Sequence, residues 1–233
     1  MTIADHIAHI QEDIAAHATH KNVTLVAVTK HASIDQMLEA FACGLCDFGE
    51  NKQQDADNHM AQLARRMPPE DFQKIRWHFI GHLQSNKVNK IAGRFALIHS
   101  VDSVKLAQKI AQTAEAQGMA QKILLQINIS GEESKSGFEP AEVDDAVTAI
   151  RALPGLSLAG LMTMAPADAS ETQAESVFRR LADLRAGLLQ RHGIDRLELS
   201  MGMTKDYVPA LRNGATIIRV GTLLFGDLAS QKP

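Results

Sequence analysis

The segment Val23-Thr-Leu-Val-Ala-Val-Thr29, followed directly by Lys30, is the first strongly apolar β-type run of the chain. Such a run predicts a buried strand, so the Lys30 amine stands where that strand reaches its carboxyl end. In an eight-stranded β/α barrel the chemistry gathers at the carboxyl ends of the strands, and a partly desolvated lysine there can form a Schiff base with a carbonyl. The alternative interpretation is a lysine whose stem packs on the strand while its amine stays in water.

From residue 23 onward, apolar β-type segments alternate with amphipathic helical segments. Eight strands are predicted, near residues 23–29, 45–49, 76–80, 95–100, 122–128, 156–163, 196–200 and 216–220. A helix is predicted after each of the first seven, near residues 34–43, 51–66, 85–92, 103–117, 140–152, 170–190 and 205–213. Alternating segments imply parallel strands with right-handed crossovers, and eight such units close into a barrel. The predicted fold class is therefore α/β, a single TIM-type (β/α)8 barrel.

One further helix is predicted before the first strand, on four isoleucines at helical spacing, Ile3, Ile7, Ile10 and Ile14. The other architecture considered is an open doubly wound sheet, which usually has fewer strands and a glycine-rich turn after the first one. Here that turn reads Lys30-His-Ala-Ser33, without glycine, which favours the barrel. No stretch rich in proline, glycine and serine divides the chain, so residues 1–233 are predicted to form one domain, with Pro68-Pro69 in a loop after a helix.

The composition is that of an ordinary globular protein, with 45% hydrophobic and 22% charged residues among 233. A net charge of −3 and a pI near 6.4 predict no overall attraction to nucleic acid or to an anionic membrane. The amino terminus carries the acidic Asp5 early and has no basic region followed by an apolar run, so it is not interpreted as a secretory signal. We therefore expect a cytoplasmic protein with no nucleic-acid or membrane partner.

Neither the cysteines nor the amino-terminal histidines predict a metal site. Cys43-Gly-Leu-Cys46 is a single C-x-x-C, and Cys43 is expected near a helix carboxyl end, where the helix dipole disfavours a thiolate. A packing role is therefore favoured over redox chemistry. The histidines of the opening helix span more than two turns, and no carboxylate or cysteine completes a compact cluster: His6, His9, His17 and His20.

Side chains that point into a barrel alternate along each strand, which predicts the residues of its interior. By this rule Lys30 points to the same side as Val26 and Val28, and His78 to the same side as Ile80. Met164 likewise shares its side with Met162 and Gly160, and Arg219 with Ile217. We therefore expect Lys30, His78, Met164 and Arg219 to line one cavity.

The loops after the seventh and eighth strands, where such barrels commonly bind phosphate, are rich in glycine and hydroxyl residues. They read Ser200-Met-Gly-Met-Thr204 and, just after Arg219, Gly221-Thr222. Residues of these types let backbone amides approach an anion. A Schiff-base lysine opposite a phosphate site suggests pyridoxal 5′-phosphate. An arginine at its ring nitrogen would keep that nitrogen unprotonated and weaken the ring as an electron sink.

Several long motifs, in order and spread over nearly the whole chain, resemble those of the pyridoxal phosphate homeostasis protein family. They are Leu25-Val-Ala-Val-Thr-Lys30, Phe48-Gly-Glu-Asn51, His78-Phe-Ile-Gly-His-Leu-Gln84, Lys135-Ser-Gly137, Gly160-Leu-Met-Thr-Met164, Leu199-Ser-Met-Gly-Met-Thr204, Arg219-Val-Gly-Thr222 and Phe225-Gly226. The resemblance implies a barrel like the amino-terminal domain of alanine racemase, with Lys30 as the Schiff-base lysine. It implies further cofactor-binding residues: Asn51, His78 and Met164 in the pocket, Ser200, Gly221 and Thr222 at the phosphate, and Arg219 at the ring nitrogen.

Three short segments depart from the family's usual residues: His31-Ala-Ser33, Lys52 and Thr204-Lys205. The last of them keeps a hydroxyl and adds a charge at the rim of the expected site. These departures bear on the affinity for the cofactor and leave the site itself in place.

Alanine racemase adds a β domain that delivers a tyrosine as the second acid/base, and this chain has only thirteen residues after Val220, too few for such a domain. Two-sided proton transfer needs two positioned groups, and Lys30 supplies one. The single tyrosine, Tyr207, is expected on the helix after the seventh strand. We therefore expect a protein of intracellular cofactor homeostasis that holds pyridoxal 5′-phosphate with little or no turnover, rather than an enzyme.

Two alternatives remain open at this point. One is a pyridoxal phosphate-dependent amino-acid racemase of weak or narrow activity, and the other is a cofactor-free barrel aldolase in which Lys30 attacks a phosphorylated sugar. The expected partners are pyridoxal 5′-phosphate and apo-enzymes that depend on it. We expect a monomer.

Overall fold

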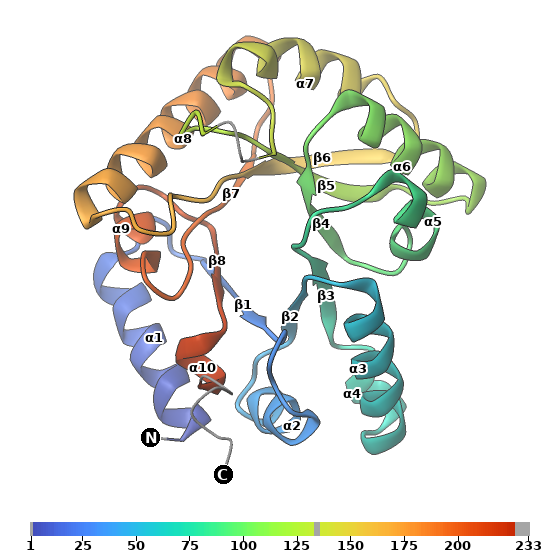
Figure 1. Cartoon of the computed structure of the whole chain (residues 1–233), viewed down its shortest axis with the longest axis vertical. Coiled ribbons are helices and arrows are strands. Elements are labelled where there is room, and N and C mark those ends of the chain that lie inside the picture. Colours follow the sequence, from blue (N-terminus) through green and yellow to red (C-terminus); the bar gives the residue numbers. More distant parts are fainter. Residues whose placement is uncertain (1, 133–135, 227–233) are drawn as a thin grey trace.

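Eight parallel strands close into one barrel in sequential order, with β8 paired to β1, and helices surround it (Figure 1). The structure is a computed structural model that describes residues 2–132 and 136–226. The strands are β1 (Thr24–Val28), β2 (Asp47–Glu50), β3 (Arg76–Phe79), β4 (Leu97–Val101), β5 (Gln121–Gln126), β6 (Leu156–Met162), β7 (Glu198–Ser200) and β8 (Ile217–Val220). The closed barrel confirms the predicted fold class and excludes the open sheet.

The helices between the strands match the predicted ranges to within a few residues, and one helix precedes β1, as predicted. The longer ones are α1 (Ile3–His17), α2 (Ile34–Ala42), α3 (Gln53–Arg66), α6 (Val104–Ala116), α7 (Val143–Arg151), α8 (Glu171–His192) and α9 (Tyr207–Arg212). The short ones are α4 (Pro69–Phe72), α5 (Val88–Ile91), α10 (Thr222–Phe225) and the 3-10 turns η1 (Ser85–Lys87) and η2 (Pro140–Glu142).

Two of the short helices correct the sequence-based expectation. The loop predicted at Pro68-Pro69 is in fact the start of α4, because a proline at the first helical position loses no hydrogen bond and has a helical φ already. The helix α10 was not predicted, since its four residues are too few to show a helical period.

Capping boxes set the starts of α2 and α8, and so the ends of the turns that follow β1 and β6. Ser33 Oγ accepts from the Gln36 N–H at 3.2 Å, while Gln36 Oε1 accepts from the Ser33 N–H at 2.8 Å. Ser170 and Gln173 repeat the arrangement at α8. Each box contributes about 1 kcal/mol to its helix. The turn that carries Lys30 is therefore held between a strand and a capped helix.

The core has two layers, one between the barrel and the helices and one inside the barrel. The inner layer consists of Val26, Leu97, Leu124, Met162 and Ile217, with Ala159 and Met164 packed against it. Val26, Met162, Met164 and Ile217 are among the residues that the alternation rule placed inside, which agrees with the rule on β1, β6 and β8. Trp77, the neighbour of His78 on β3, points to the outside of the barrel, where its ring centroid lies 5.8 Å from that of Phe48.

Helix α1 contacts α2, α9 and α10 on the outside of the barrel (Figure 1). His6 Nδ1 lies 3.1 Å from the carbonyl oxygen of Leu224, and the hydroxyl of Tyr207 donates to Asp13. Within residues 2–132 and 136–226, no group of three or more histidine, cysteine or acidic side chains is placed to hold a metal ion. No helix in these same ranges is long and apolar enough to cross a bilayer.

Candidate functional site

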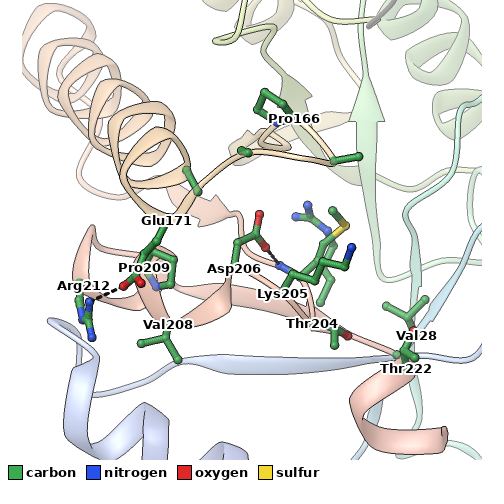
Figure 2. Close-up of a pocket in the computed structure, with 16 residues that line it drawn as sticks. Val28, Pro166, Glu171, Thr204, Lys205, Asp206, Val208, Pro209, Arg212 and Thr222 are labelled. Carbon is green, nitrogen blue, oxygen red and sulfur yellow. Dashed lines mark hydrogen bonds and ion pairs between the residues drawn. The ribbon is translucent and has the colours of Figure 1, made fainter. Parts of the chain in front are cut away.

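A cavity of about 660 Å³ opens at the carboxyl ends of β1, β7 and β8 (Figure 2). One wall comes from residues 166–174, which lead into α8, and another from residues 203–212, which form the loop after β7 and helix α9. Val28, Arg219, Gly221 and Thr222 complete the lining. The cavity therefore lies at the end of the barrel where catalytic and phosphate-binding groups of this architecture are found.

Two glycines let the backbone fold closely around this cavity. A Cβ at Gly221 would meet the carbonyl oxygen of Val28 at 3.1 Å, so a larger residue there would push the loop after β8 and the end of β1 apart by a few tenths of an ångström. Gly202 has φ +89° and its carbonyl oxygen accepts from the Arg219 N–H at 3.0 Å. Both glycines belong to the two loops predicted to bind phosphate, and this close packing brings the loops together at one side of the cavity.

Arg219 supplies a fixed positive charge to the cavity. Its side chain is buried, Nη2 donates to the carbonyl oxygen of Thr163 at 3.1 Å, and Nη1 donates to the Ser200 hydroxyl. Burial lowers the pKa of Arg219 to about 10, against the opposing effect of Asp206. The guanidinium is still protonated at neutral pH and is held from two sides.

Asp206 is the acidic counterpart of Arg219 in this cavity, and sequence reasoning did not find it. Burial raises the pKa of Asp206, although the Met203 N–H, which donates to its Oδ1 at 2.6 Å, and the charge of Arg219 act in the opposite direction. At the rim, Arg212 donates to Glu171 at 2.9 Å (Figure 2). The position of Asp206 just before α9 carries no motif that would mark it in the sequence.

The structure does not bring all the predicted cofactor residues to this cavity. Arg219, Gly221 and Thr222 line it, whereas Lys30, Asn51 and Met164 lie at the neighbouring ends of β1, β2 and β6, outside its lining. Lys30 is exposed in the turn after β1, two residues beyond Val28. Lys135 lies outside the described residues.

Asn51 follows the last residue of β2, and its side-chain oxygen is buried with no hydrogen-bond partner among the described residues. A buried acceptor without a donor is costly, so such an atom is suited to receive a hydrogen bond from a ligand. Met164 is half-buried and packs against the inner layer of the barrel.

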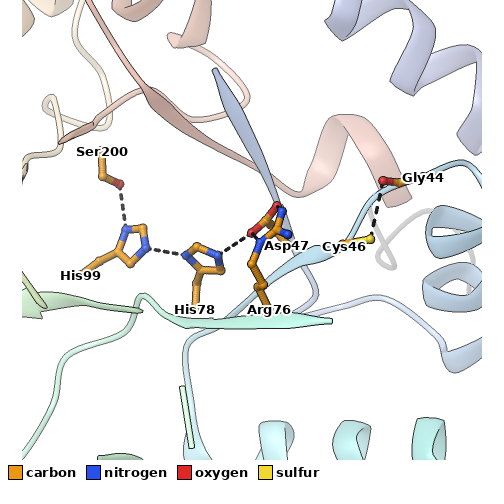
Figure 3. Close-up of polar contacts among 7 residues, drawn as sticks. All are labelled: Gly44, Cys46, Asp47, Arg76, His78, His99 and Ser200. Atoms are coloured by element: carbon orange, nitrogen blue, oxygen red, sulfur yellow. Dashed lines mark hydrogen bonds and ion pairs between the residues drawn. The ribbon is translucent and has the colours of Figure 1, made fainter. Parts of the chain in front are cut away.

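His78 and Ser200 are buried below the cavity, in a line of polar side chains that crosses the barrel (Figure 3). His78 lies 2.9 Å from Asp47 Oδ1 on one side and 2.9 Å from His99 Nε2 on the other. His99 Nδ1 is 2.8 Å from Ser200 Oγ. The predicted contact between Ser200 and a phosphate stays a prediction. In the structure this hydroxyl is completely buried and contacts His99 and Arg219.

The charges along this line are set by burial and by pairing. Burial would raise the pKa of Asp47, but hydrogen bonds from His78 and Arg76 outweigh it and lower that pKa. Burial, with the neighbouring His78 and Arg219, holds the pKa of His99 well below the usual range, so His99 is neutral. Asp47 and His99 were not singled out from the sequence, although both are polar residues at positions where the strand alternation points inward.

A second polar pair, the buried Glu50 and the half-buried His59, lies beside the turn that carries Lys30. Glu50 is fully buried, and its Oε1 lies 2.6 Å from His59 Nδ1 and within hydrogen-bond distance of the Thr29 hydroxyl. The hydrogen bond to Glu50 raises the pKa of His59, against the effect of burial. Thr29, immediately before Lys30, is thus tied to β2 through a side chain that sequence reasoning did not assign.

The cysteines take no part in the site. Cys43 is the C-cap residue of α2, which confirms its predicted place at a helix carboxyl end, but it is exposed, so the packing role expected for it is wrong; neither thiol is in a disulfide. The sulfur of Cys46 lies 3.8 Å from the carbonyl oxygen of Gly44.

Comparison with known proteins gives consistent matches over the whole barrel. Residues 4–229 match the family model of the alanine racemase N-terminal domain. The pyridoxal phosphate homeostasis protein of Pseudomonas aeruginosa is 40% identical over 230 residues, which cover 97% of this chain and 95% of that protein. The protein of the same name from Escherichia coli K12 is 36% identical and covers 96% of each chain.

Solved structures agree with these relatives. PipY of Synechococcus elongatus PCC7942 with pyridoxal phosphate bound has a TM-score of 0.84 and 34% identity, covering 97% of this chain and 100% of that one. An alanine racemase of Clostridium difficile 630 has a TM-score of 0.69 at 15% identity, which shows a shared fold, and the match covers 57% of that longer chain.

Proposed function

The chain belongs to the pyridoxal phosphate homeostasis proteins and carries the alanine racemase N-terminal domain, and on this basis we propose that it binds pyridoxal 5′-phosphate reversibly in cofactor homeostasis. The observation that carries the proposal is the buried Arg219, held between Ser200 and Thr163 in the cavity. A protonated guanidinium can only donate, so it leaves the ring nitrogen of the cofactor unprotonated. Such a ring stabilises a carbanion poorly, which suits a protein that holds the cofactor more than one that uses it.

The residues around the cavity fit the chemical groups of this cofactor. Thr204, Gly221 and Thr222 line one side, and we assign the phosphate to them, since hydroxyls and close backbone suit an anion. Lys30, just beyond Val28, is the amine that we propose would hold the cofactor through its aldehyde carbon, with the aldehyde oxygen leaving as water. The unpartnered oxygen of Asn51 would accept from the ring hydroxyl. We place Met164 against the ring and His78 beneath the pocket.

Proton transfer on both faces of the cofactor is what an enzyme of the racemase type would require. When bound, the cofactor supplies an aldehyde that bonds reversibly to amines. Turnover would need a second acid or base facing Lys30, and the one tyrosine does not meet this need. Tyr207 is absent from the cavity lining, its hydroxyl donates to Asp13 of α1, and burial together with that bond raises its pKa.

Transfer and turnover assays test the proposal. The purified protein loaded with pyridoxal 5′-phosphate is mixed with an apo-enzyme that needs it, and the activity recovered by that enzyme is followed in time. We expect complete transfer, and no amino acid of a test panel consumed by the loaded protein alone. Sustained turnover near 1 per second, lost in Lys30→Ala, would show an enzyme such as a racemase instead. Sedimentation of the loaded protein tests the further proposal that it is a monomer.

A further inference from the structure

Four polar side chains from four strands form a continuous line through the barrel interior (Figure 3). Asp47 and Arg76 are the first residues of β2 and β3, and Ser200 is the last residue of β7. The line therefore begins at the amino-terminal end of the barrel and ends beneath the cavity. Its members are Asp47, His78, His99 and Ser200, all buried, with Arg76 donating to Asp47 at the outer end and Arg219 donating to Ser200 at the inner end.

The donors and acceptors along this line can be assigned from its outer end. An ionised carboxylate only accepts, so the nitrogen of His78 that faces Asp47, Nε2, must carry a hydrogen. The neutral form of His78 carries a single hydrogen, and the contact with Asp47 places it on Nε2. Its Nδ1 is therefore an acceptor.

The assignment of donors and acceptors continues along the line toward the cavity. His99 Nε2 must donate to His78 Nδ1, which leaves His99 Nδ1 as an acceptor. The Ser200 hydroxyl then donates to His99, and its oxygen accepts from Arg219. The reverse direction fails, because a bare nitrogen of His78 would face a carboxylate oxygen at 2.9 Å, and the hydroxyl hydrogen of Ser200 would have no acceptor in the line.

We propose that Asp47 fixes the direction of this hydrogen-bond chain, and that His78, His99 and Ser200 are positioning residues that hold Arg219 at the cavity. The single hydrogen of the Ser200 hydroxyl is used on His99, so it is not free to bind a phosphate. Ser200 and the carbonyl of Thr163 together fix the plane of the guanidinium. The consequence for cofactor binding rests on the proposed function, whereas the direction of the chain does not.

Nitrogen-15 NMR of the imidazole rings tests the direction without any cofactor chemistry. Two-bond proton–nitrogen spectra of the full chain at a pH of about 8 show which nitrogen of each ring carries the hydrogen, well above the ordinary histidine pKa of about 6.5. We expect both His78 and His99 to carry it on Nε2. Ser200→Ala should leave both assignments unchanged, because the direction is set at the other end. A hydrogen on Nδ1 of either ring in the unaltered protein overturns the proposal.

Two variants of Asp47 sharpen this test. Asp47→Ala removes the acceptor, so we expect His78 and His99 to show mixed tautomers, whereas Asp47→Asn keeps a side-chain oxygen and should retain them. Unchanged tautomers in a folded Asp47→Ala protein contradict the proposal. If that variant does not fold, the spectrum of the unaltered protein and that of Ser200→Ala still decide.

Ligand affinities separate a positioning role of Ser200 from a phosphate contact. Ser200→Ala should weaken pyridoxal 5′-phosphate and phosphate-free pyridoxal by the same factor, about tenfold, because it acts through Arg219. Thr222→Ala is the control and should weaken only the phosphorylated ligand. A loss in Ser200→Ala confined to the phosphorylated ligand would assign the hydroxyl to the phosphate and overturn the positioning role. If the unaltered protein binds neither ligand, the proposed function is refuted, while the conclusion from the NMR spectra is unaffected.

Discussion

Replacing Asp47 by alanine should destabilise the protein far more than the same change at Asp144, although both carboxylates have the same kinds of partner. Asp47 accepts from Arg76 and His78, and Asp144 accepts from Arg191 and His192. The side chain of Asp47 is only 9% exposed and that of His78 6%, whereas the side chain of Asp144 is 44% exposed. Asp47→Ala leaves the buried His78 N–H without an acceptor. Asp144→Ala leaves Arg191 and His192 able to form hydrogen bonds with water instead.

The magnitudes follow from this difference in burial. A buried hydrogen bond to a charged group contributes about 1.5–3 kcal/mol, so Asp47→Ala should lower the free energy of unfolding by that amount. An exposed ion pair contributes about 0–1 kcal/mol, which sets the expectation for Asp144→Ala. Urea unfolding at neutral pH, followed by circular dichroism, measures both. Equal losses in the two variants would refute the assignment of Asp47 as the anchor of the buried line.

The effect of Asp47 should also depend on pH in one direction. Its pKa is lowered in the folded protein, so its contribution is present above the ordinary aspartate pKa of 3.8 and is lost as the pH falls through the lower folded value. The difference in the free energy of unfolding between the unaltered protein and Asp47→Ala should therefore be constant near neutral pH and shrink below about pH 4. If the free energies of unfolding of the two proteins differ by the same amount in acid as at neutral pH, this linkage is contradicted.

Three further changes test other parts of the site. Thr222→Ala should weaken pyridoxal 5′-phosphate about tenfold in a fluorescence titration, and an unchanged Kd would place the phosphate elsewhere. The pKa of His59 is raised by Glu50, so the stability lost in His59→Gln should be largest below the ordinary pKa of 6.5 and should fade as the pH rises through the raised value; a loss independent of pH would exclude this pairing. Tyr207→Phe removes the bond to Asp13 and should lower stability by about 1 kcal/mol while leaving the cofactor affinity unchanged; a large loss of affinity would place the phenol in the site.

The barrel could be predicted because apolar β-type segments alternate with amphipathic helical segments along the chain. The same alternation placed Val26, Met162 and Ile217 inside, and the structure puts all three in the inner layer. Short helices such as α10 escaped prediction because one turn has no period to detect. The one-domain organisation stays a prediction.

The polar line through the barrel could not be predicted, because it depends on register as well as alternation. Strand alternation predicts that His78 points inward, but only strand pairing brings it to Asp47, with Asp47 opposite Arg76 and Gly49 opposite His78. Resemblance to a family assigned Ser200 to the phosphate, which stays a prediction, and it gave no sign of the contacts of Ser200 with His99 and Arg219. Asp206 lies in a loop, where neither alternation nor a motif marks a residue as part of the cavity.

Site-specific trapping of pyridoxal 5′-phosphate tests the central claim most directly. The purified protein is incubated with the cofactor and reduced with borohydride, and its peptides are weighed by mass spectrometry. One modified peptide should appear, carrying the label on Lys30, and it should be lost in Lys30→Ala but kept in Lys205→Ala, which removes a lysine that lines the cavity. Absence of any label, or equal labelling of the Lys30→Ala protein at other lysines, would contradict the account.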